Sequence, residues 1–465
     1  MTSINDIVKK AHTSQGNLNA FVTIIDNPTN DIISNSKLSQ QTVAIKDNLS
    51  TKGILSTGSS NTLKDYIPFF DATAVKKLKE NGALIIGKTA MDELGMGGTG
   101  TTAHSGIIKN PWDLSRMCAG SSAGSAAVVA AGIVPFALGS DTGDSIRKPA
   151  AWCGIVGFKP TYGLISRYGL FPFATSLDTV GTFARSVSEI ALVTDAIKGK
   201  DELDMTSWDS SKINLSDSLT GNVKNKKLCY IKEICDITSY QNPSEELKQT
   251  LTIFQETLKK CQTLGIIIEE VKIDLNILNA IFPTYQCISC AEATSNYSNL
   301  TGISFGPRGE GKTIEEIIKS HRTQGFSSLI KRRFIIGSYV LQKENQEKFF
   351  LNACRARKVI VDTINNLFTN FDGLILPCSE AGAKKIEENE KITKNDAMLT
   401  ILENHLAIGN FGGFPSITIP NGFVNELPIG INITGAIKDD ANILNIAYAI
   451  ESTMNYKDQI AKGWD

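Results

Sequence analysis

Two turns rich in glycine and serine, residues 119–125 and 139–145, carry the side chains best suited to chemistry. They flank an apolar segment, 126–138, whose length suits a helix followed by a strand, with Pro135 near the changeover. Glycines let a backbone approach a ligand closely, and the N-terminus of a helix presents unpaired N–H groups. Small hydroxyl-rich turns brought together in this way indicate acyl chemistry with a serine nucleophile.

The base that would activate such a serine is less obvious. The chain has four histidines, and the two that follow the turns, His321 and His405, do not lie in catalytic-looking loops. Lys46 ends an apolar segment, 43–46, which we expect to be a buried strand. An ammonium there must be solvated, paired or neutralised. Taken alone, Lys46 is better explained as a surface lysine in a turn, but the shortage of histidines makes it a candidate base.

One serine motif, Gly120-Ser-Ser122-Ala-Gly124, fits the G-x-S-x-G nucleophile elbow of the α/β-hydrolases. The elbow requires a strand immediately before it, and we expect residues 110–116 to form a loop. It also requires a downstream histidine base. We therefore favour other serines over Ser122.

Two further glycine motifs resemble nucleotide-binding loops. Residues 82–89 match the phosphate loop, but the four middle residues are Ala-Leu-Ile-Ile, which we expect to lie in a strand with their N–H groups in the sheet. Residues 95–100 match G-x-G-x-x-G without directly following a strand. We reject a nucleotide site and interpret 95–100 as a glycine-rich loop of the active site.

The composition is that of a soluble globular enzyme, with 465 residues, 42% hydrophobic and 20% charged. The formal net charge of −1 argues against global attraction to nucleic acid or acidic membranes. The first residues lack an apolar signal core, and the longest apolar run, 126–139, is too short and too interrupted to span a membrane. Nine scattered cysteines favour reduced thiols. We expect a cytoplasmic protein without membrane attachment.

Strand and helix patterns alternate along most of the chain, which predicts an α/β fold. We expect a single domain over 1–465, with a weakly helical N-terminal region at 1–40 and an α/β and helical elaboration at 199–365. The basic cluster Lys331-Arg-Arg333 is interpreted as a solvated face. Expected strands are 43–46, 83–86, 154–159, 228–231, 266–271, 374–376, 416–419 and 429–434, and expected helices are 73–81, 186–198, 245–262 and 441–453.

The run from Ser121 to Lys159 resembles the amidase signature family, and Lys46 in Ile-Lys-Asp-Asn is similar to that family's catalytic lysine. The similarity covers most of the chain, from about residue 43 onward. It implies a large mixed central β-sheet flanked by helices on both faces. Further similar stretches are 91–98, 159–163, 176–181, 305–308 and 331–334.

The resemblance implies a Ser–Ser–Lys triad. Ser145 matches the nucleophile, Ser121 the bridging serine, which adopts a cis peptide in the family, and Lys46 the base. A lysine can act as a base only where burial or its neighbours favour the neutral form. The N–H groups of Thr142, Gly143, Asp144 and Ser145 match the oxyanion hole.

Within the family, the chain resembles members that hydrolyse glutamine and send the ammonia to a partner. Two further subunits are implied, a B-type kinase and transferase and a small C-type subunit. The first would bind ATP and Mg²⁺ and convert Glu-tRNA(Gln) to Gln-tRNA(Gln), or Asp-tRNA(Asn) to Asn-tRNA(Asn), and would hold most of the tRNA. No cofactor or metal is expected in this chain. The glutamine pocket is expected to contain Arg357 for the α-carboxylate, Glu403 for the α-amino group, Phe305, Gly97 and Gly98.

Several positions depart from the family pattern. Asp144 replaces a glycine beside the nucleophile, and if its charge opposes the oxyanion, Asp144→Gly should raise turnover. Phe305 replaces a tyrosine, and Glu403 replaces an aspartate. The region 1–40 is shorter than usual, so an early helix is expected to be missing. Two alternatives stay open: a stand-alone amidase acting on another small amide, and a weakly active or non-catalytic scaffold subunit.

Overall fold

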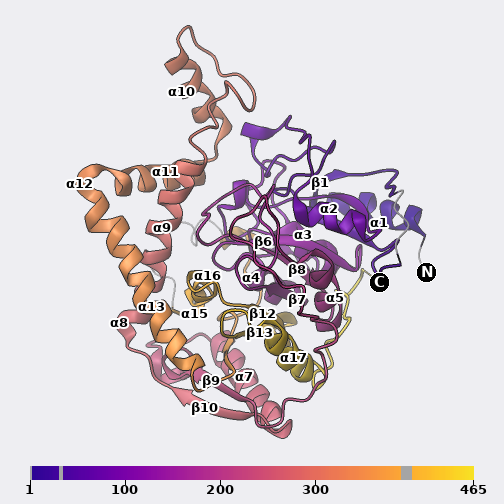
Figure 1. The fold of residues 1–465 in the computed structure, drawn as a ribbon, viewed down its shortest axis with the longest axis vertical. Coiled ribbons are helices and arrows are strands. Elements are labelled where there is room, and N and C mark those ends of the chain that lie inside the picture. Colours follow the sequence, from indigo (N-terminus) through magenta and orange to yellow (C-terminus); the bar gives the residue numbers. More distant parts are fainter. Residues whose placement is uncertain (1–2, 31–34, 389–400, 465) are drawn as a thin grey trace.

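One large mixed β-sheet forms the centre of the computed structural model, which describes residues 3–30, 35–388 and 401–464 (Figure 1). In that part of the chain, eleven strands pair in the order β1-β3-β2-β6-β8-β7-β12-β13-β11-β9-β10, and β4 and β5 form a separate hairpin. The pairs β2–β3, β2–β6, β9–β10 and β9–β11 are parallel, and the other neighbours are antiparallel. The strands are β1 Phe21–Ile24, β2 Thr42–Lys46, β3 Leu84–Thr89, β4 Lys109–Asn110, β5 Asp113–Met117, β6 Phe136–Asp141, β7 Val156–Lys159, β8 Thr179–Ala184, β9 Lys227–Ile231, β10 Ile267–Val271, β11 Gly373–Pro377, β12 Ser416–Val424 and β13 Leu427–Thr434.

Helices cover both faces of this sheet, as the alternation of side chains along β2 shows. Val43 and Ile45 belong to one apolar cluster, which includes residues of α2 and α5, whereas Ala44 belongs to a second cluster with α3. The predicted α/β fold with helices on both faces is therefore confirmed. The helices are α1 Ile4–Leu18, α2 Thr73–Glu80, α3 Ala123–Ala130, α4 Arg147–Cys153, α5 Val187–Ile197, α6 Lys232–Cys235, α7 Glu245–Thr263, α8 Leu275–Asn279, α9 Ile281–Asn296, α10 Ile314–Gly325, α11 Ser328–Leu341, α12 Lys343–Gln346, α13 Asn352–Phe368, α15 Ile401–Asn404, α16 Ala407–Phe411 and α17 Asp440–Glu451.

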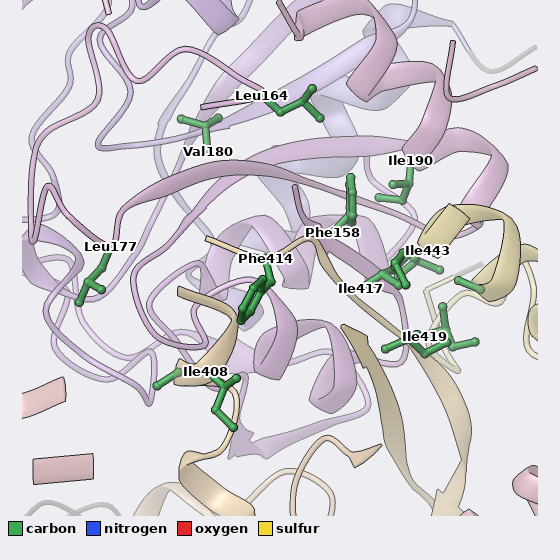
Figure 2. Packing of buried hydrophobic residues seen from close by; sticks show 14 of the residues in the cluster. Phe158, Leu164, Leu177, Val180, Ile190, Ile408, Phe414, Ile417, Ile419 and Ile443 are labelled. Atoms are coloured by element: carbon green, nitrogen blue, oxygen red, sulfur yellow. The ribbon is translucent and has the colours of Figure 1, made fainter. Parts of the chain in front are cut away.

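The larger apolar cluster lies where β7 and β12 meet. Phe158 and Ile417 are cross-strand partners, and Ile443 of α17 belongs to the same cluster (Figure 2). All three are fully buried. Burying side chains of this size stabilises a fold by about 1.5–3 kcal/mol each relative to leaving them exposed. This cluster therefore holds the middle of the sheet and the helices of one face together.

Local sequence explains the long helix α7, which confirms the helix expected at 245–262. Ser244 is its N-cap and accepts a hydrogen bond from the N–H of Leu247. The buried side chains recur every three or four residues and face the sheet, at Leu247, Thr250, Leu251, Phe254, Thr257, Leu258 and Cys261.

Two local predictions were wrong. The N-terminal region is not only helical, because β1 follows α1 and pairs with β3 at the edge of the sheet. α1, capped by Ser3, is the helix of the region expected to be weakly helical. Residues 110–116 do not form a loop, since β5 lies there and pairs with β4.

The helices α9 to α13 form a group beside the sheet, in the region where mostly helical structure was expected. α9 packs against both α11 and α13, and α10 projects away from the body at the top of Figure 1. Among the described residues, no helix combines the length and apolarity that a membrane crossing requires. Seven of the nine cysteines, all within the described ranges, are buried, and all nine are free thiols.

Candidate active site

Lys46 lies at the end of β2 and is completely buried. It follows Ala44 by two residues and therefore points to the face that α3 covers. Its Nζ lies 2.8 Å from Ser121 Oγ and 2.9 Å from Ser140 Oγ, and it donates to the carbonyl oxygen of Ser140 at 3.2 Å. The structure thus joins the predicted base to the predicted bridging serine, 75 residues apart in the chain.

Burial of Lys46 lowers the pKa of its amine to about 7, although the carboxylates of Asp141 and Asp92 act in the opposite direction. Burial disfavours the charged form of a lysine. A substantial fraction of Lys46 is therefore neutral near neutral pH and can accept a proton.

We expect amide hydrolysis to follow the titration of Lys46. The amine acts as a base only when neutral, so kcat/KM should rise as pH increases through about 7 and level off above it. A pH profile of kcat/KM measures this. A profile that stays flat from pH 6 to 9, or that falls above pH 7, contradicts a neutral lysine base.

Ser121 and Ser145 come from the two turns on either side of α3 and β6. The peptide bond between Gly120 and Ser121 is cis, as the resemblance implied. The N–H of Ser122 donates to the carbonyl oxygen of Ser145 at 3.3 Å, which ties the two turns together. Ser145 is 4% exposed, and its hydroxyl makes no hydrogen bond to any residue that the structure describes. This hydroxyl is therefore uncommitted.

The carbonyl groups of Gly143 and Asp144 accept hydrogen bonds from the start of α4. Arg147 donates to the carbonyl oxygen of Gly143 at 2.7 Å, and the N–H of Lys148 donates to that of Asp144 at 2.9 Å. Because N–H and C=O point in opposite directions across a trans peptide unit, the N–H groups of Asp144 and Ser145 face the other side. No described residue accepts a hydrogen bond from the N–H groups of residues 142–145. Such a row of free donors can bind an oxyanion.

A buried ion pair holds this turn in place. Arg147 donates to both carboxylate oxygens of Asp141, at 3.0 Å and 2.9 Å, and both side chains are fully buried. Arg147 also donates to Asn410 Oδ1 at 2.7 Å. Thr142 is fixed from another direction, since its hydroxyl donates to Asp178 at 2.6 Å.

Removal of Arg147 is expected to destabilise the protein. Arg147→Ala leaves Asp141 buried without its cation, which should lower the free energy of unfolding by about 3–5 kcal/mol. The matched control is Arg355→Ala, whose pair with Glu347 is exposed and should change the free energy of unfolding by less than about 1 kcal/mol. Denaturant unfolding measures both, and equal effects would refute a structural role specific to Arg147.

A cavity of about 140 Å³ opens beside this turn. The turn contributes Gly143 and Asp144, α9 contributes Tyr285, and α11 contributes Arg332 and Arg333. The remaining lining residues are Gly97, Gly98, Thr99, Lys148, Trp152, Phe282, Gln286, Leu329, Lys384, Glu403, Asn404 and Ala407. The cavity therefore combines acidic and basic side chains, which suits a small molecule carrying both charges.

Three of the five expected pocket residues, Gly97, Gly98 and Glu403, line this cavity. Asp92 shapes the loop that carries the two glycines, since its carboxylate accepts N–H hydrogen bonds from residues 99 to 102 at 2.9–3.2 Å.

The other two expected pocket residues are not brought to the cavity. Arg357 uses its guanidinium to bind Ser176 and the carbonyl oxygen of Phe411, at 2.9–3.0 Å. Phe305 is 38% exposed and packs edge-on against Tyr66, with ring centroids 6.2 Å apart. We correct both assignments, because the side chains are used elsewhere in the fold.

Sequence reasoning missed the cations that α11 supplies. Arg332 and Arg333 were interpreted as a solvated face, yet both line the cavity, and Arg333 lies over the Phe173 ring at 5.6 Å. Tyr285 was also missed; its ring approaches Gly143 so closely that a Cβ there would lie 2.9 Å from it. The similarity of 331–334 to the family was the available signal for the arginines.

The rejected motifs have structural roles. Residues 84–89 form β3, fully buried, so the phosphate-loop pattern is part of a strand. Ser122 Oγ donates to the carbonyl oxygen of Ser140 at 3.0 Å. The Nδ1 atoms of His321 and His405 lie 2.8 Å from the carbonyl oxygens of Pro307 and Leu402. Although β5 precedes the motif, it lies outside the main sheet, so the elbow arrangement is not formed.

The family model of amidases matches residues 3–444. The chain belongs to the amidase family. It is 40% identical to the A-type subunit of glutamyl-tRNA(Gln) amidotransferase from Lysinibacillus sphaericus, over 91% of this chain and 85% of the relative. The protein of the same name from Halothermothrix orenii is 38% identical over 98% and 94% of the two chains.

Solved structures share the fold of this chain. The crystal structure of the A-type subunit of glutamyl-tRNA(Gln) amidotransferase from Thermotoga maritima superposes with a TM-score of 0.80 at 34% identity, covering 97% of this chain and 92% of that one. The peptide amidase of Stenotrophomonas maltophilia has a TM-score of 0.77 at 21% identity over 96% and 92% of the chains, a likeness of fold alone.

Proposed function

We propose that this chain is the glutaminase subunit of a tRNA-dependent amidotransferase. It hydrolyses the side-chain amide of glutamine and supplies ammonia for the conversion of Glu-tRNA(Gln) to Gln-tRNA(Gln). The observation that carries the proposal is the buried contact between Lys46 and Ser121, beside an uncommitted Ser145 and a row of free N–H groups. The relatives named above support the choice of glutamine and of tRNA.

The mechanism follows from this geometry. Neutral Lys46 takes the proton of Ser121 as Ser121 takes the proton of Ser145, and Ser145 Oγ forms a bond to the amide carbon. The N–H groups of residues 142–145 stabilise the oxyanion, and each such donor is typically worth about 3–4 kcal/mol in the transition state. The C–N bond then breaks, the proton passes to the leaving nitrogen, and ammonia departs. Water hydrolyses the remaining ester by the same proton path and releases glutamate.

The charged cavity supports a free amino acid as substrate. Arg332, Arg333 and Lys384 can attract the α-carboxylate, and guanidinium groups suit carboxylates because they donate in a planar fork. Acidic side chains in the same cavity can attract the α-ammonium. An aryl or lipid amide carries neither of the two charges that these side chains can attract. This favours the glutaminase over a stand-alone amidase for another small amide.

The reaction on tRNA would take place on partner subunits. We propose a B-type partner that binds ATP, Mg²⁺ and most of the tRNA, and a small C-type partner. The formal charge of −1 on this chain is compatible with that division, since nucleic-acid binding relies on positive charge. No metal or cofactor takes part in the steps assigned to this chain.

Co-expression with the two partner subunits tests the function. The complex should release ammonia from glutamine and, with ATP and Glu-tRNA(Gln), form Gln-tRNA(Gln). Release of ammonia without any amidation of tRNA would favour the stand-alone amidase. Amidation that proceeds with free ammonia but never with glutamine would favour the scaffold subunit.

A further inference from the structure

The acidic residue predicted to bind the substrate's α-ammonium is already engaged. Glu403 forms an ion pair with Lys148, and both side chains are at least nine-tenths buried. The other carboxylate oxygen of Glu403 accepts the N–H of Glu380 at 3.0 Å. Both oxygens of Glu403 therefore have partners from the protein itself.

Lys148 contacts the Trp152 ring as well as Glu403. Its Nζ lies 5.5 Å from the centroid of the Trp152 ring. Although burial acts against it, attraction by Glu403 and Asp144 raises the pKa of Lys148. Lys148 therefore stays charged and neutralises one of the two carboxylates on this wall of the cavity.

Asp144 is the other carboxylate, and it has no comparable partner. It lines the same cavity and immediately precedes Ser145 in the sequence. No described residue donates a hydrogen bond to its side chain. Burial raises the pKa of Asp144 to about 6, partly offset by Lys148, so the group is mostly ionised at neutral pH. With Glu403 paired to Lys148, Asp144 is the carboxylate of this wall that can still accept a hydrogen bond from an ammonium group.

We propose that Asp144 binds the α-ammonium of the amino-acid substrate and thereby determines specificity, while the Lys148–Glu403 pair shapes the wall beside it. This inference rests on the proposed glutaminase function. The cations that also line the cavity, Arg332, Arg333 and Lys384, can attract the α-carboxylate. Asp144 is thus a specificity residue. Its negative charge attracts the α-ammonium of the substrate, although it also opposes the negative charge of the oxyanion.

The test compares glutamine with glutaramate, which has the same amide and carboxylate but lacks the α-ammonium. In the complex with its partner subunits, Asp144→Asn should lower kcat/KM for glutamine about ten- to hundredfold, chiefly through KM, as expected for a lost hydrogen bond to a charged group. The kcat/KM for glutaramate should change less than about threefold, since glutaramate makes no such contact. The preference for glutamine over glutaramate, measured as the ratio of the two kcat/KM values, should therefore be largely lost.

A double variant is the matched control. Lys148→Gln combined with Glu403→Gln removes the ion pair without changing the net charge of the cavity. Its preference for glutamine over glutaramate should persist, whatever happens to the overall rate. If Asp144→Asn keeps the preference, or if the double variant loses it as fully as Asp144→Asn does, the proposal is overturned.

Binding separates this inference from the function on which it rests. Calorimetric titration of the Ser145→Ala complex with glutamine and glutaramate needs no catalysis. Preference for glutamine that disappears on adding Asp144→Asn supports the role of Asp144 even if wild type releases no ammonia. Equal binding of the two compounds by Ser145→Ala overturns it.

Discussion

Replacing Ser145 with alanine is expected to lower kcat for glutamine hydrolysis by about 10⁴- to 10⁶-fold, the range seen when a hydrolase loses its nucleophile. Ser145 lies in the turn whose N–H groups are free, and its hydroxyl is uncommitted. Without it, no covalent intermediate can form. The free energy of unfolding should change little, because no described residue depends on this hydroxyl for a hydrogen bond. Ammonia release by the assembled complex and denaturant unfolding measure the two effects.

The matched control for this variant is Ser122→Ala. Ser122 is the serine that the elbow motif would make the nucleophile, and it is equally buried. Its hydroxyl donates to the carbonyl oxygen of Ser140 and accepts from the N–H of Ser140 at 3.4 Å. We therefore expect a loss of stability from two hydrogen bonds, with activity within about tenfold of wild type. If Ser122→Ala abolished glutamine hydrolysis while Ser145→Ala retained it, Ser122 and not Ser145 would be the nucleophile.

Replacing Lys46 with methionine has the second largest expected effect. Methionine keeps the length and apolar stem of the side chain but cannot take a proton from Ser121. Loss of a general base typically costs about 10²- to 10⁴-fold, so kcat/KM should fall by that factor. The dependence of the remaining activity on pH near 7 should also disappear, because that dependence is assigned to Lys46.

Lys88 provides a control of the same chemistry. It lies on the neighbouring strand β3, is also fully buried, and donates to the carbonyl oxygen of Leu49 at 2.7 Å. Lys88→Met should lower stability, yet the activity per folded molecule and its pH profile should stay within about threefold of wild type, since Lys88 makes no contact with the triad serines. Equal losses in both variants would assign the effect of Lys46→Met to damaged folding.

Much of the fold could be predicted from periodicity. Segments such as 43–46 and 245–262 carry strong apolar patterns and form β2 and α7 as expected. β1 was missed because its place in the sheet depends on pairing with β3, which is distant in the chain. Pairing between distant segments leaves no local pattern, so such short strands are not predictable from propensity alone.

The candidate site could be predicted only in part from the sequence. Ser121, Ser145 and Lys46 were identified through the resemblance, because spacing cannot show that residues 75 positions apart touch. Arg357 was misassigned and Arg333 overlooked, since the packing of α9 and α11 decides which basic side chain lines the cavity. The proposed contact of Asp144 with the α-ammonium also changes the result expected from Asp144→Gly. Because this variant removes that contact, we now expect a lower turnover of glutamine and not a gain.

The central claim is that Ser145 is acylated by the side chain of glutamine. Rapid acid quenching of the complex during turnover, followed by peptide mass spectrometry, tests it most directly. We expect a γ-glutamyl ester on the peptide that carries Ser145, formed with stoichiometric release of ammonia and absent from Ser145→Ala. An ester on Ser121 or Ser122, or ammonia release that persists in Ser145→Ala, would contradict the account.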